Sequence, residues 1–538
     1  MKLTRKNKFI SMTETVGGEY YISRPLLSLS IHVSFPSLTV FISLIAKSIS
    51  MASEDRNEEE LHVLLVAFSA QGHINPLLRL GKKLLSRGLH VTLATTELVY
   101  HRVFKSSAAT PTATVPTSIT TNGIQVLFFS DGFGTGLDNK TITPDQYMEL
   151  IGKFGPISLS NIIKDHFLNG SQKLVCIINN PFVPWVADVA ANFNIPCACL
   201  WIQPCALYAI YYRFYNNLNT FPTLEDPSMN VELPGLPLLQ PQDLPSFVLP
   251  SNPHGSIPKV LSSMFQHMKK LKWVLANSFH ELEKEVIDSM AELCPITTVG
   301  PLVPPSLLGQ DENIEGDVGI EMWKPQDSCM EWLNQQPPSS VIYVSFGSII
   351  VLTAKQLESI ARALRNSEKP FLWVVKRRDG EEALPLPEGF VEETKEKGMV
   401  VPWCPQTKVL SHPSVACFLT HCGWNSMLEA ITAGTPMIAW PQWTDQPTNA
   451  KLISDVFRLG IRLAQESDGF VATEEMERAF ERIFSAGDFK RKASELKRAA
   501  REAVAQGGSS EQNIQCFVDE IIGTKSTWWL DQDQIQLW

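Results

Sequence analysis

The feature that most constrains the fold is an apolar run at residues 61–68, which reads LHVLLVAF. A continuous run of β-forming residues is typical of a parallel strand buried on both faces. The residues after it predict a helix that begins at Pro76, with Asn75 as its N-cap, and ends at Gly88. A second strand is expected at 89–96, and the resulting strand, helix, strand unit predicts an α/β fold.

This alternation recurs in two groups along the chain. Strand-like runs at 173–180 and 272–278 each precede a helical pattern, and the alternation restarts at 340–348 after a polar stretch without periodicity. Two Rossmann-like parallel-sheet domains that face a cleft are therefore expected. The expected boundaries are 61–302 for the N-terminal domain, 303–322 for a linker, 323–504 for the C-terminal domain and 505–523 for a closing helix.

The two ends of the chain differ from the rest, and residues 1–60 and 524–538 are expected to be unstructured. The basic start and the run LTVFISLIA suggest a targeting segment, but Pro36 and nearby polar residues make the apolar stretch too short and polar to span a membrane. Met51 then opens MASEDRNEEE, which is typical of the start of a soluble protein.

Composition excludes some classes of partner. The formal net charge is −10 and no cluster of Lys and Arg is present, which argues against a nucleic-acid surface. The ten cysteines show no metal-ligand spacing, so a reducing, cytoplasmic location is expected. We expect a monomer without stable membrane insertion whose partners are small molecules.

Candidate ligand loops follow the predicted strands. Open parallel sheets bind ligands at the carboxyl ends of their strands, which selects His73, Ser348 and the segment 421–426. No GxGxxG lies in these loops, which disfavours a nicotinamide or flavin enzyme.

The segment THCGWNSMLEA, at 420–430, permits two interpretations. Ser426 and Glu429 have the spacing of a capping box at a helix start. The same helix start could instead bind an anionic phosphate, since Gly423 would admit the ligand and its neighbours would donate hydrogen bonds. The two interpretations compete for the side chain of Glu429.

Residues 403–446 resemble, at nearly every position, the signature of plant family 1 UDP-dependent glycosyltransferases, the secondary-product glycosyltransferases. The resemblance extends from about Leu61 to Gly523 and includes the loop QGHINP. It implies a glycosyltransferase B fold in which the C-terminal domain binds the UDP-sugar and the N-terminal domain binds the acceptor.

The resemblance also implies roles for residues of the donor site. Trp403 would stack on uracil, Gln406 would lie near the uridine, and Glu429 would bind the ribose hydroxyls. The residues expected around the diphosphate are Ser348, His421, Gly423, Asn425 and Ser426. The residues expected to face the sugar are Trp424, Asp445 and Gln446. A Gln at this last position is associated in the family with glucose, so UDP-glucose is the expected donor.

The resemblance implies that His73 is the catalytic base, and its ordinary pKa of about 6.5 suits proton removal near neutrality. Family members commonly pair this His with an Asp, but the matching residue here is Asn180. An Asn brings no negative charge, and in serine proteases the same exchange costs about 10⁴ in rate. Asp188, two helical turns further on, is expected to be structural.

The exchange matters less if the acceptor is already an anion, as a carboxylic acid with a pKa of about 4 is at neutral pH. The runs INNPFVPW and LWIQPCA, the latter with Gln203, also resemble the branch that forms glucose esters of hydroxycinnamates and hydroxybenzoates. We therefore expect inverting transfer of glucose to an aromatic carboxylic acid, in a pocket that Gln203, loop 128–140 and segment 208–215 would line. The alternatives are glucosylation of phenolic hydroxyls and a catalytically silent UDP-sugar-binding protein.

No cofactor is expected besides UDP-glucose as donor substrate. The motif DQD at 531–533 spells the metal-binding motif of the other glycosyltransferase fold, but it lies in the tail, which is expected to be an appended segment, and the match is interpreted as chance. No divalent metal is expected to be needed, because a helix terminus and hydrogen-bond donors would stabilise the diphosphate.

Overall fold

The structure is a computed structural model with two compact units, residues 1–59 and residues 60–538. The ranges that it describes are 2–5, 8–14, 20–23, 60–104, 115–121, 123–132, 143–169, 172–252, 255–310, 317–321, 328–375 and 386–523. The tail 524–538, with the motif at 531–533, and residues 133–140 of the expected acceptor loop lie outside the described residues.

The first unit contains a small antiparallel sheet where the sequence predicts little structure. Its strands are β1 (Lys2–Arg5), β2 (Lys8–Glu14) and β3 (Tyr20–Ser23), in the order β1-β2-β3. Each strand pairs with its neighbour in sequence, so this sheet needs only short loops to close. At residues 2–5, 8–14 and 20–23 the structure therefore has strands where an unstructured extension is expected from the sequence.

The second unit begins with an eight-stranded sheet. The order is β11-β10-β9-β8-β4-β5-β7-β6, and all pairs are parallel except β6 with β7. The strands are β4 (Glu60–Val66), β5 (His90–Thr96), β6 (Ser118–Thr121), β7 (Ile124–Phe129), β8 (Gln172–Asn179), β9 (Cys197–Trp201), β10 (Trp273–Ala276) and β11 (Thr297–Thr298). The run at 61–68 thus forms a central strand, and residues 63–66 are fully buried.

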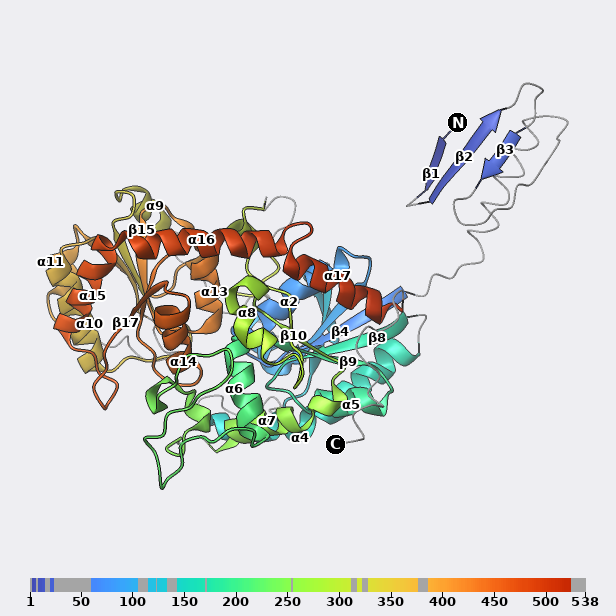
Figure 1. The fold of residues 1–538 in the computed structure, drawn as a ribbon, viewed down its shortest axis with the longest axis horizontal. Helices are drawn as coiled ribbons and strands as arrows, with labels where there is room; N and C mark the ends of the chain where they lie inside the picture. The colour runs from blue at the N-terminus through green and yellow to red at the C-terminus, as the bar shows by residue number, and fades with distance from the viewer. Residues whose placement is uncertain are drawn as a thin grey trace. The chain divides into compact units, whose positions relative to one another are not determined.

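A six-stranded sheet follows, and every pair in it is parallel. The order is β14-β13-β12-β15-β16-β17. The strands are β12 (Val341–Ser345), β13 (Phe371–Val374), β14 (Gly398–Val401), β15 (Val415–Thr420), β16 (Met437–Ala439) and β17 (Gly460–Arg462). The expected α/β class with two Rossmann-like parallel sheets is confirmed (Figure 1).

Helices cover both sheets. The α-helices are α2 (Gln71–Leu85), α3 (Glu97–Val99), α4 (Pro144–Ile163), α5 (Val186–Asn192), α6 (Cys205–Tyr215), α7 (Ser256–Gln266), α8 (His280–Asp288), α9 (Ser328–Asn334), α10 (Ala354–Ser367), α11 (Phe390–Thr394), α12 (Gln406–Ser411), α13 (Trp424–Ala433), α14 (Gln446–Lys451), α15 (Thr473–Ser485), α16 (Gly487–Val504) and α17 (Ser509–Ile521). Among the described residues, no helix has the length and apolar character needed to cross a membrane.

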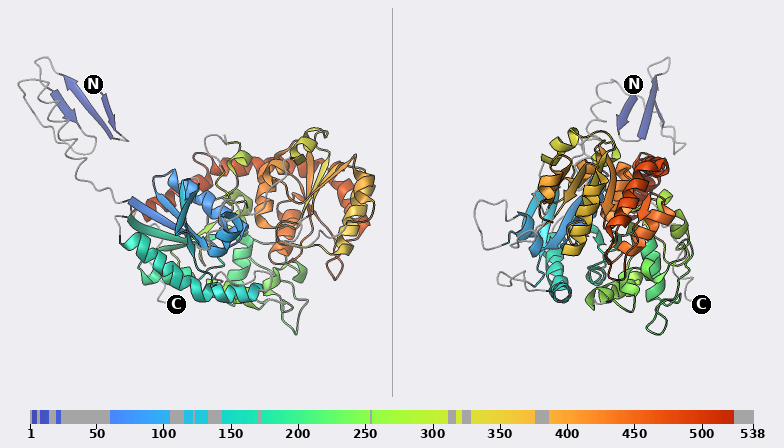
Figure 2. Two further views of the ribbon diagram at one scale, coloured as in Figure 1. Left: turned by 180° about the vertical axis from the view of Figure 1, so that it is seen from behind. Right: turned by 90° about the vertical axis from the view of Figure 1, so that its left-hand side faces the viewer.

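The last two helices join the two halves of the second unit. Helix α16 runs along the half that contains the six-stranded sheet, and α17 lies over the half that contains the eight-stranded sheet (Figures 1 and 2). Leu496 and Ala500 of α16 pack into a core cluster that contains β12 and β15 residues, whereas Ile514 and Phe517 of α17 pack into the core of the eight-stranded sheet. The chain therefore crosses back to the N-terminal half before the described residues end.

Candidate active site

The two candidate catalytic residues meet at the point where the strand order of the eight-stranded sheet reverses its direction. His73 follows β4 and Asn180 follows β8, and these strands are parallel neighbours although their elements are far apart in sequence. Their loops therefore leave the same edge of the sheet side by side, at a topological switch point. The His73 Nδ1 and Asn180 Oδ1 atoms lie 2.7 Å apart.

The second contact of Asn180 determines which nitrogen of His73 carries the proton. The Asn180 Oδ1 atom also accepts a hydrogen bond from the backbone N–H of Phe182, at 3.2 Å, so the atom facing the imidazole is the amide oxygen. An oxygen acceptor requires Nδ1 of His73 to donate. Nε2 is then the unprotonated nitrogen, which is the form a general base needs.

Aromatic rings enclose the imidazole. The centroids of Phe68 and Phe182 lie 5.2 and 4.8 Å from that of His73, and Phe182 meets the ring edge-on. This burial lowers the pKa of His73 to about 4, and the hydrogen bond to Asn180 offsets only part of the effect. His73 is therefore neutral at physiological pH and able to accept a proton.

The lowered pKa predicts an unusual pH profile. The imidazole stays neutral above about pH 4, so kcat/KM with a phenolic acceptor should hold from pH 7 to about 5 and fall only below that range. In Asn180→Asp, a carboxylate beside the ring would stabilise the imidazolium and raise the pKa of His73, which should move this fall upward by about one pH unit or more. A wild-type fall centred near pH 6.5, unchanged in Asn180→Asp, would contradict this account.

Helix α2 begins earlier than the sequence predicts. It starts at Gln71 with Ala70 as N-cap, so His73 lies in its first turn and Pro76 lies inside it. Pro76 has no N–H to donate to the carbonyl of Gly72, four residues before it. That carbonyl instead accepts a hydrogen bond from Nδ2 of Asn425, at 2.9 Å. The prediction of Asn75 as N-cap and Pro76 as first residue was wrong because a partner distant in sequence satisfies the freed carbonyl.

The close approach of Asn425 explains the glycine at position 72. A Cβ atom at Gly72 would lie 2.9 Å from Asn425 Nδ2, which is too close for a real contact. Asn425 would have to move, and the first turn of α2 with His73 would lose its contact with the C-terminal half.

We therefore expect Gly72→Ala to lower kcat/KM by about tenfold, since small displacements of catalytic groups are costly. Its melting temperature should fall little, because alanine favours the helix. Gly152→Ala is the matched control, because a Cβ atom at Gly152 meets nothing within 4 Å. Equal kcat/KM of the two variants would show that the close approach of Asn425 to Gly72 does not affect catalysis.

Helix α13 also begins before its expected capping residue. Its first residue is Trp424, its N-cap is Gly423, and no side chain caps it. The predicted capping box of Ser426 and Glu429 was wrong, because Ser426 already lies within the helix. Their side chains instead share one donor, as Nε2 of Gln406 lies 2.9 Å from Ser426 Oγ and 2.8 Å from Glu429 Oε2.

The environment of Glu429 contains charges from elsewhere in the chain. Burial raises the pKa of its carboxyl, while the hydrogen bond from Gln406 and the nearby Arg79 lower it. Arg79 belongs to α2 and is itself paired with Asp317, at 3.0 Å, in the segment between the two sheets. Trp403, half-buried, packs against the core beside this end of the site.

His421 follows β15 and lies against two glycines. A Cβ atom would lie 2.7 Å from its ring at Gly347 and 2.5 Å from it at Gly423, so only glycine fits at either position. Burial lowers the pKa of His421 to about 4, and a backbone hydrogen bond with Ser345 raises it in part. Ser348 lies in the same loop as Gly347, after the neighbouring strand β12, so these residues flank the switch point of the second sheet.

The three residues expected to face a sugar have different environments. Trp424 is only 3% exposed, and its indole N–H donates to the carbonyl of Asn277 in the N-terminal half, at 2.8 Å. Its indole is thus committed to the interface and has no further N–H to offer a sugar. Asp445 and Gln446 are buried at the start of α14, where Asp445 accepts hydrogen bonds from Thr444 and Asn449.

The residues expected at the acceptor site are only partly brought together. Gln203 is half-buried after β9, at the same sheet edge as His73. Tyr208 and Tyr211, by contrast, are fully buried in an aromatic core with Trp201 and do not line an open surface. Helix periodicity could have shown this burial.

Three groups near His73 are not predicted from the sequence. They are Phe68, Phe182 and Tyr147, whose hydroxyl lies 2.5 Å from Ser69 Oγ. Phe68 and Phe182 lie in the same loops as the catalytic pair, which was a usable signal. Tyr147 comes from α4, and nothing in its local sequence marks it.

Two minor predictions concern Asp188 and metal ions. Asp188 pairs with His267, at 3.0 Å, and with Lys270, so it serves the packing of α5 as expected.

Within the described ranges, His62, His90 and Glu60 place ligand-type atoms within 4.8 Å of one another. They lie at the amino ends of β4 and β5, away from the site, and the two imidazoles are stacked at 8°, so their lone pairs do not converge on one ion.

Comparisons with known proteins give a consistent result. The family model described as UDP-glucoronosyl and UDP-glucosyl transferase matches residues 260–502. UDP-glycosyltransferase 84B1 of Arabidopsis thaliana is 44% identical over 86% of this chain and 98% of its own length. Gallate 1-beta-glucosyltransferase 84A24 of Punica granatum is 41% identical over 86% of this chain and 89% of its own. The crystal structure of Os79 from O. sativa in complex with UDP superposes with a TM-score of 0.75 at 31% identity, covering 85% of this chain and all of that one.

Proposed function

Because the chain belongs to the family of UDP-dependent glycosyltransferases, we propose that it transfers glucose from UDP-glucose to the carboxylate of a small aromatic acid and forms a β-glucose ester. The observation that carries the choice of acceptor is the hydrogen bond between His73 and the uncharged Asn180. This pair provides a neutral base without the negative charge that would stabilise its protonated form.

A carboxylic acid does not need such a base. Its pKa of about 4 makes it an anion at neutral pH, whereas a phenol near 10 must lose a proton during the reaction. Transfer of that proton to His73 would create an imidazolium among aromatic rings, where burial already holds the pKa near 4. His73 therefore acts mainly by orienting the acceptor, and Gln203 contributes to the acceptor site.

The reaction is a single in-line displacement. A carboxylate oxygen forms a bond to the anomeric carbon while the bond from that carbon to the diphosphate oxygen breaks. UDP leaves with the bonding electrons, and the α-linked donor becomes a β-linked product. The start of α13 and the side chains of Ser348, His421 and Ser426 stabilise the charge that develops on the diphosphate.

The donor is bound by the C-terminal half without a metal or a separate cofactor. Trp403 stacks on the uracil, and Glu429 with Gln406 binds the ribose, an arrangement supported by the hydrogen bond that Nε2 of Gln406 donates to Glu429, at 2.8 Å. Asp445 and Gln446 contact glucose. Location in the reducing cytoplasm is supported by the cysteines, all ten of which are free thiols.

One acceptor with both groups tests the proposal directly. With UDP-glucose and 4-hydroxybenzoate, the expected product is the ester, which loses its glucose in mild alkali. An alkali-stable product would show transfer to the phenol instead. Binding of UDP-glucose without any transfer to a panel of aromatic acids and phenols would favour a silent binding protein.

A further inference from the structure

A short segment of the N-terminal half, residues 240–248, contacts the C-terminal half beside the proposed sugar site. It contains two 3₁₀ turns, η5 (Pro241–Asp243) and η6 (Ser246–Val248), and we call it the bridging segment. Asp243 is 3% exposed although it carries a charge. A buried carboxylate is tolerated only when charged or hydrogen-bonding partners surround it.

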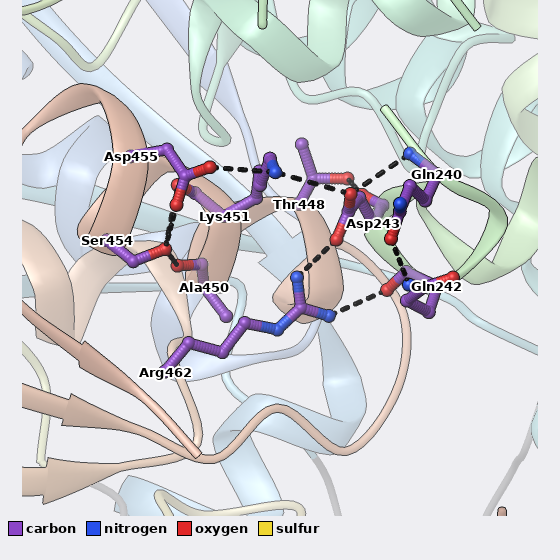
Figure 3. Close-up of polar contacts among 9 residues, drawn as sticks. All are labelled: Gln240, Gln242, Asp243, Thr448, Ala450, Lys451, Ser454, Asp455 and Arg462. Atoms are coloured by element: carbon purple, nitrogen blue, oxygen red, sulfur yellow. Dashed lines mark hydrogen bonds and ion pairs between the residues drawn. The ribbon is translucent and has the colours of Figure 1, made fainter. Parts of the chain in front are cut away.

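The partners of Asp243 come from two elements of the C-terminal half. Its Oδ1 atom accepts a hydrogen bond from the guanidinium of Arg462 in β17, and its Oδ2 atom lies 3.6 Å from Nζ of Lys451 in α14 (Figure 3). Arg462 also donates to the carbonyl of Gln242, at 2.8 Å. Within the segment, the backbone N–H of Gln240 donates to Oδ2, at 3.0 Å.

Two further hydrogen bonds, each to or from a backbone group, attach the bridging segment to the C-terminal half. They lie on either side of Asp445 and Gln446, the residues proposed to contact the sugar. The carbonyl of Asp243 accepts a hydrogen bond from the buried hydroxyl of Thr448, at 2.6 Å. The N–H of Ser246 donates to the carbonyl of Thr444, at 2.8 Å. The residues between these two anchors are 445–447, which include Asp445 and Gln446 at the start of α14.

We propose that Asp243 is a positioning residue that sets the placement of Asp445 and Gln446 through its ion pairs with Arg462 and Lys451. The inference rests on the proposed function, because it assumes that these two residues contact the sugar. Its consequence is specific. Loss of the charge on Asp243 should disturb recognition of the glucosyl group, whereas the uracil and ribose contacts at Trp403 and Glu429 belong to other loops and should persist.

Asp243→Asn tests this idea with little change of shape, and Asp455→Asn is its matched control. Asp455 also pairs with Lys451, at 2.7 Å, but its side chain is 44% exposed and lies on the side of Lys451 away from Asp243 (Figure 3). Asp243→Asn should lower kcat/KM for UDP-glucose by about tenfold or more. It should also narrow the preference for UDP-glucose over UDP-galactose, while the Kd for UDP changes less than about twofold. Asp455→Asn should leave all three quantities within about twofold of the wild type.

A double-mutant cycle guards against a variant that folds poorly. Arg462→Gln removes the cationic partner of the ion pair with Asp243. The loss of kcat/KM in this variant should match the loss in Asp243→Asn. The double variant should then be little worse than either single variant, because the pair is already broken.

Three results would overturn the inference. They are equal behaviour of Asp243→Asn and Asp455→Asn, a parallel loss of UDP affinity and sugar transfer in Asp243→Asn, and additive losses in the cycle. Failure of the proposed function is distinguishable, since it would appear in the unmodified protein as a lack of glucose transfer.

Discussion

Replacing His73 with alanine should separate the two acceptor classes. With a phenolic acceptor, kcat should fall by about 10²-fold to 10⁴-fold, the usual contribution of a general base. With an aromatic carboxylate it should fall by only about tenfold, the size expected when one orienting hydrogen bond is lost. The reason is that the carboxylate has no proton to give to Nε2, the nitrogen left free by the contact with Asn180.

The measurement is kcat for both acceptors at saturating UDP-glucose and neutral pH. His267→Ala is a suitable control, since it removes an imidazole that pairs with Asp188 instead of with Asn180. Equal losses for both acceptors would mean that His73 removes no proton from either of them, and the argument from Asn180 would fail. Full loss with the carboxylate would make His73 essential to ester formation for a reason other than basicity.

Replacing Glu429 with alanine should weaken donor binding far more than it destabilises the fold. Hydrogen bonds to charged groups contribute about 1.5–3 kcal/mol, so the Kd for UDP should rise by about 10-fold to 100-fold. The free energy of unfolding should change little, because α13 begins at Trp424 without a side-chain cap and Glu429 caps nothing. Alanine also has a high helix propensity at this interior position.

Calorimetric titration with UDP and thermal unfolding without ligand measure the two effects separately. Glu481→Ala, at an exposed position of α15, controls for the loss of one carboxylate. A large loss of stability with unchanged UDP affinity would return Glu429 to a structural role. The Kd of Glu429→Gln for UDP should lie between those of the wild type and Glu429→Ala, since this variant keeps the size of the side chain and loses only its charge.

Much of the fold could be predicted from periodicity alone. The run at 61–68 and its later counterparts became the strands of two parallel sheets, because such runs can be buried only between helices. The rule that ligands bind at the carboxyl ends of strands then brought His73 and Asn180 to one edge, across 107 positions of sequence. The resemblance to plant UDP-dependent glycosyltransferases is confirmed by relatives that are 41–44% identical over 86% of the chain.

The local predictions that failed have a common cause. The starts of α2 and α13 were placed by capping rules, which assume that a helix terminus is satisfied by its own neighbours in sequence. At Gly72 the freed carbonyl is satisfied by Asn425, from the other half of the molecule. At Ser426 the hydroxyl is used by Gln406 instead of by the helix backbone.

By itself, the sequence determined the elements, their layering and the identity of the groups at each strand end, since these depend on periodicity and on chemistry local to the chain. Only the tertiary structure decided which atoms those groups use. The proton on Nδ1 of His73, the shared donor at Glu429 and the buried charge of Asp243 each depend on a partner from a distant segment. Hydrogen bonds and ion pairs act over a few ångströms, so their partners are fixed only when folding brings those segments together.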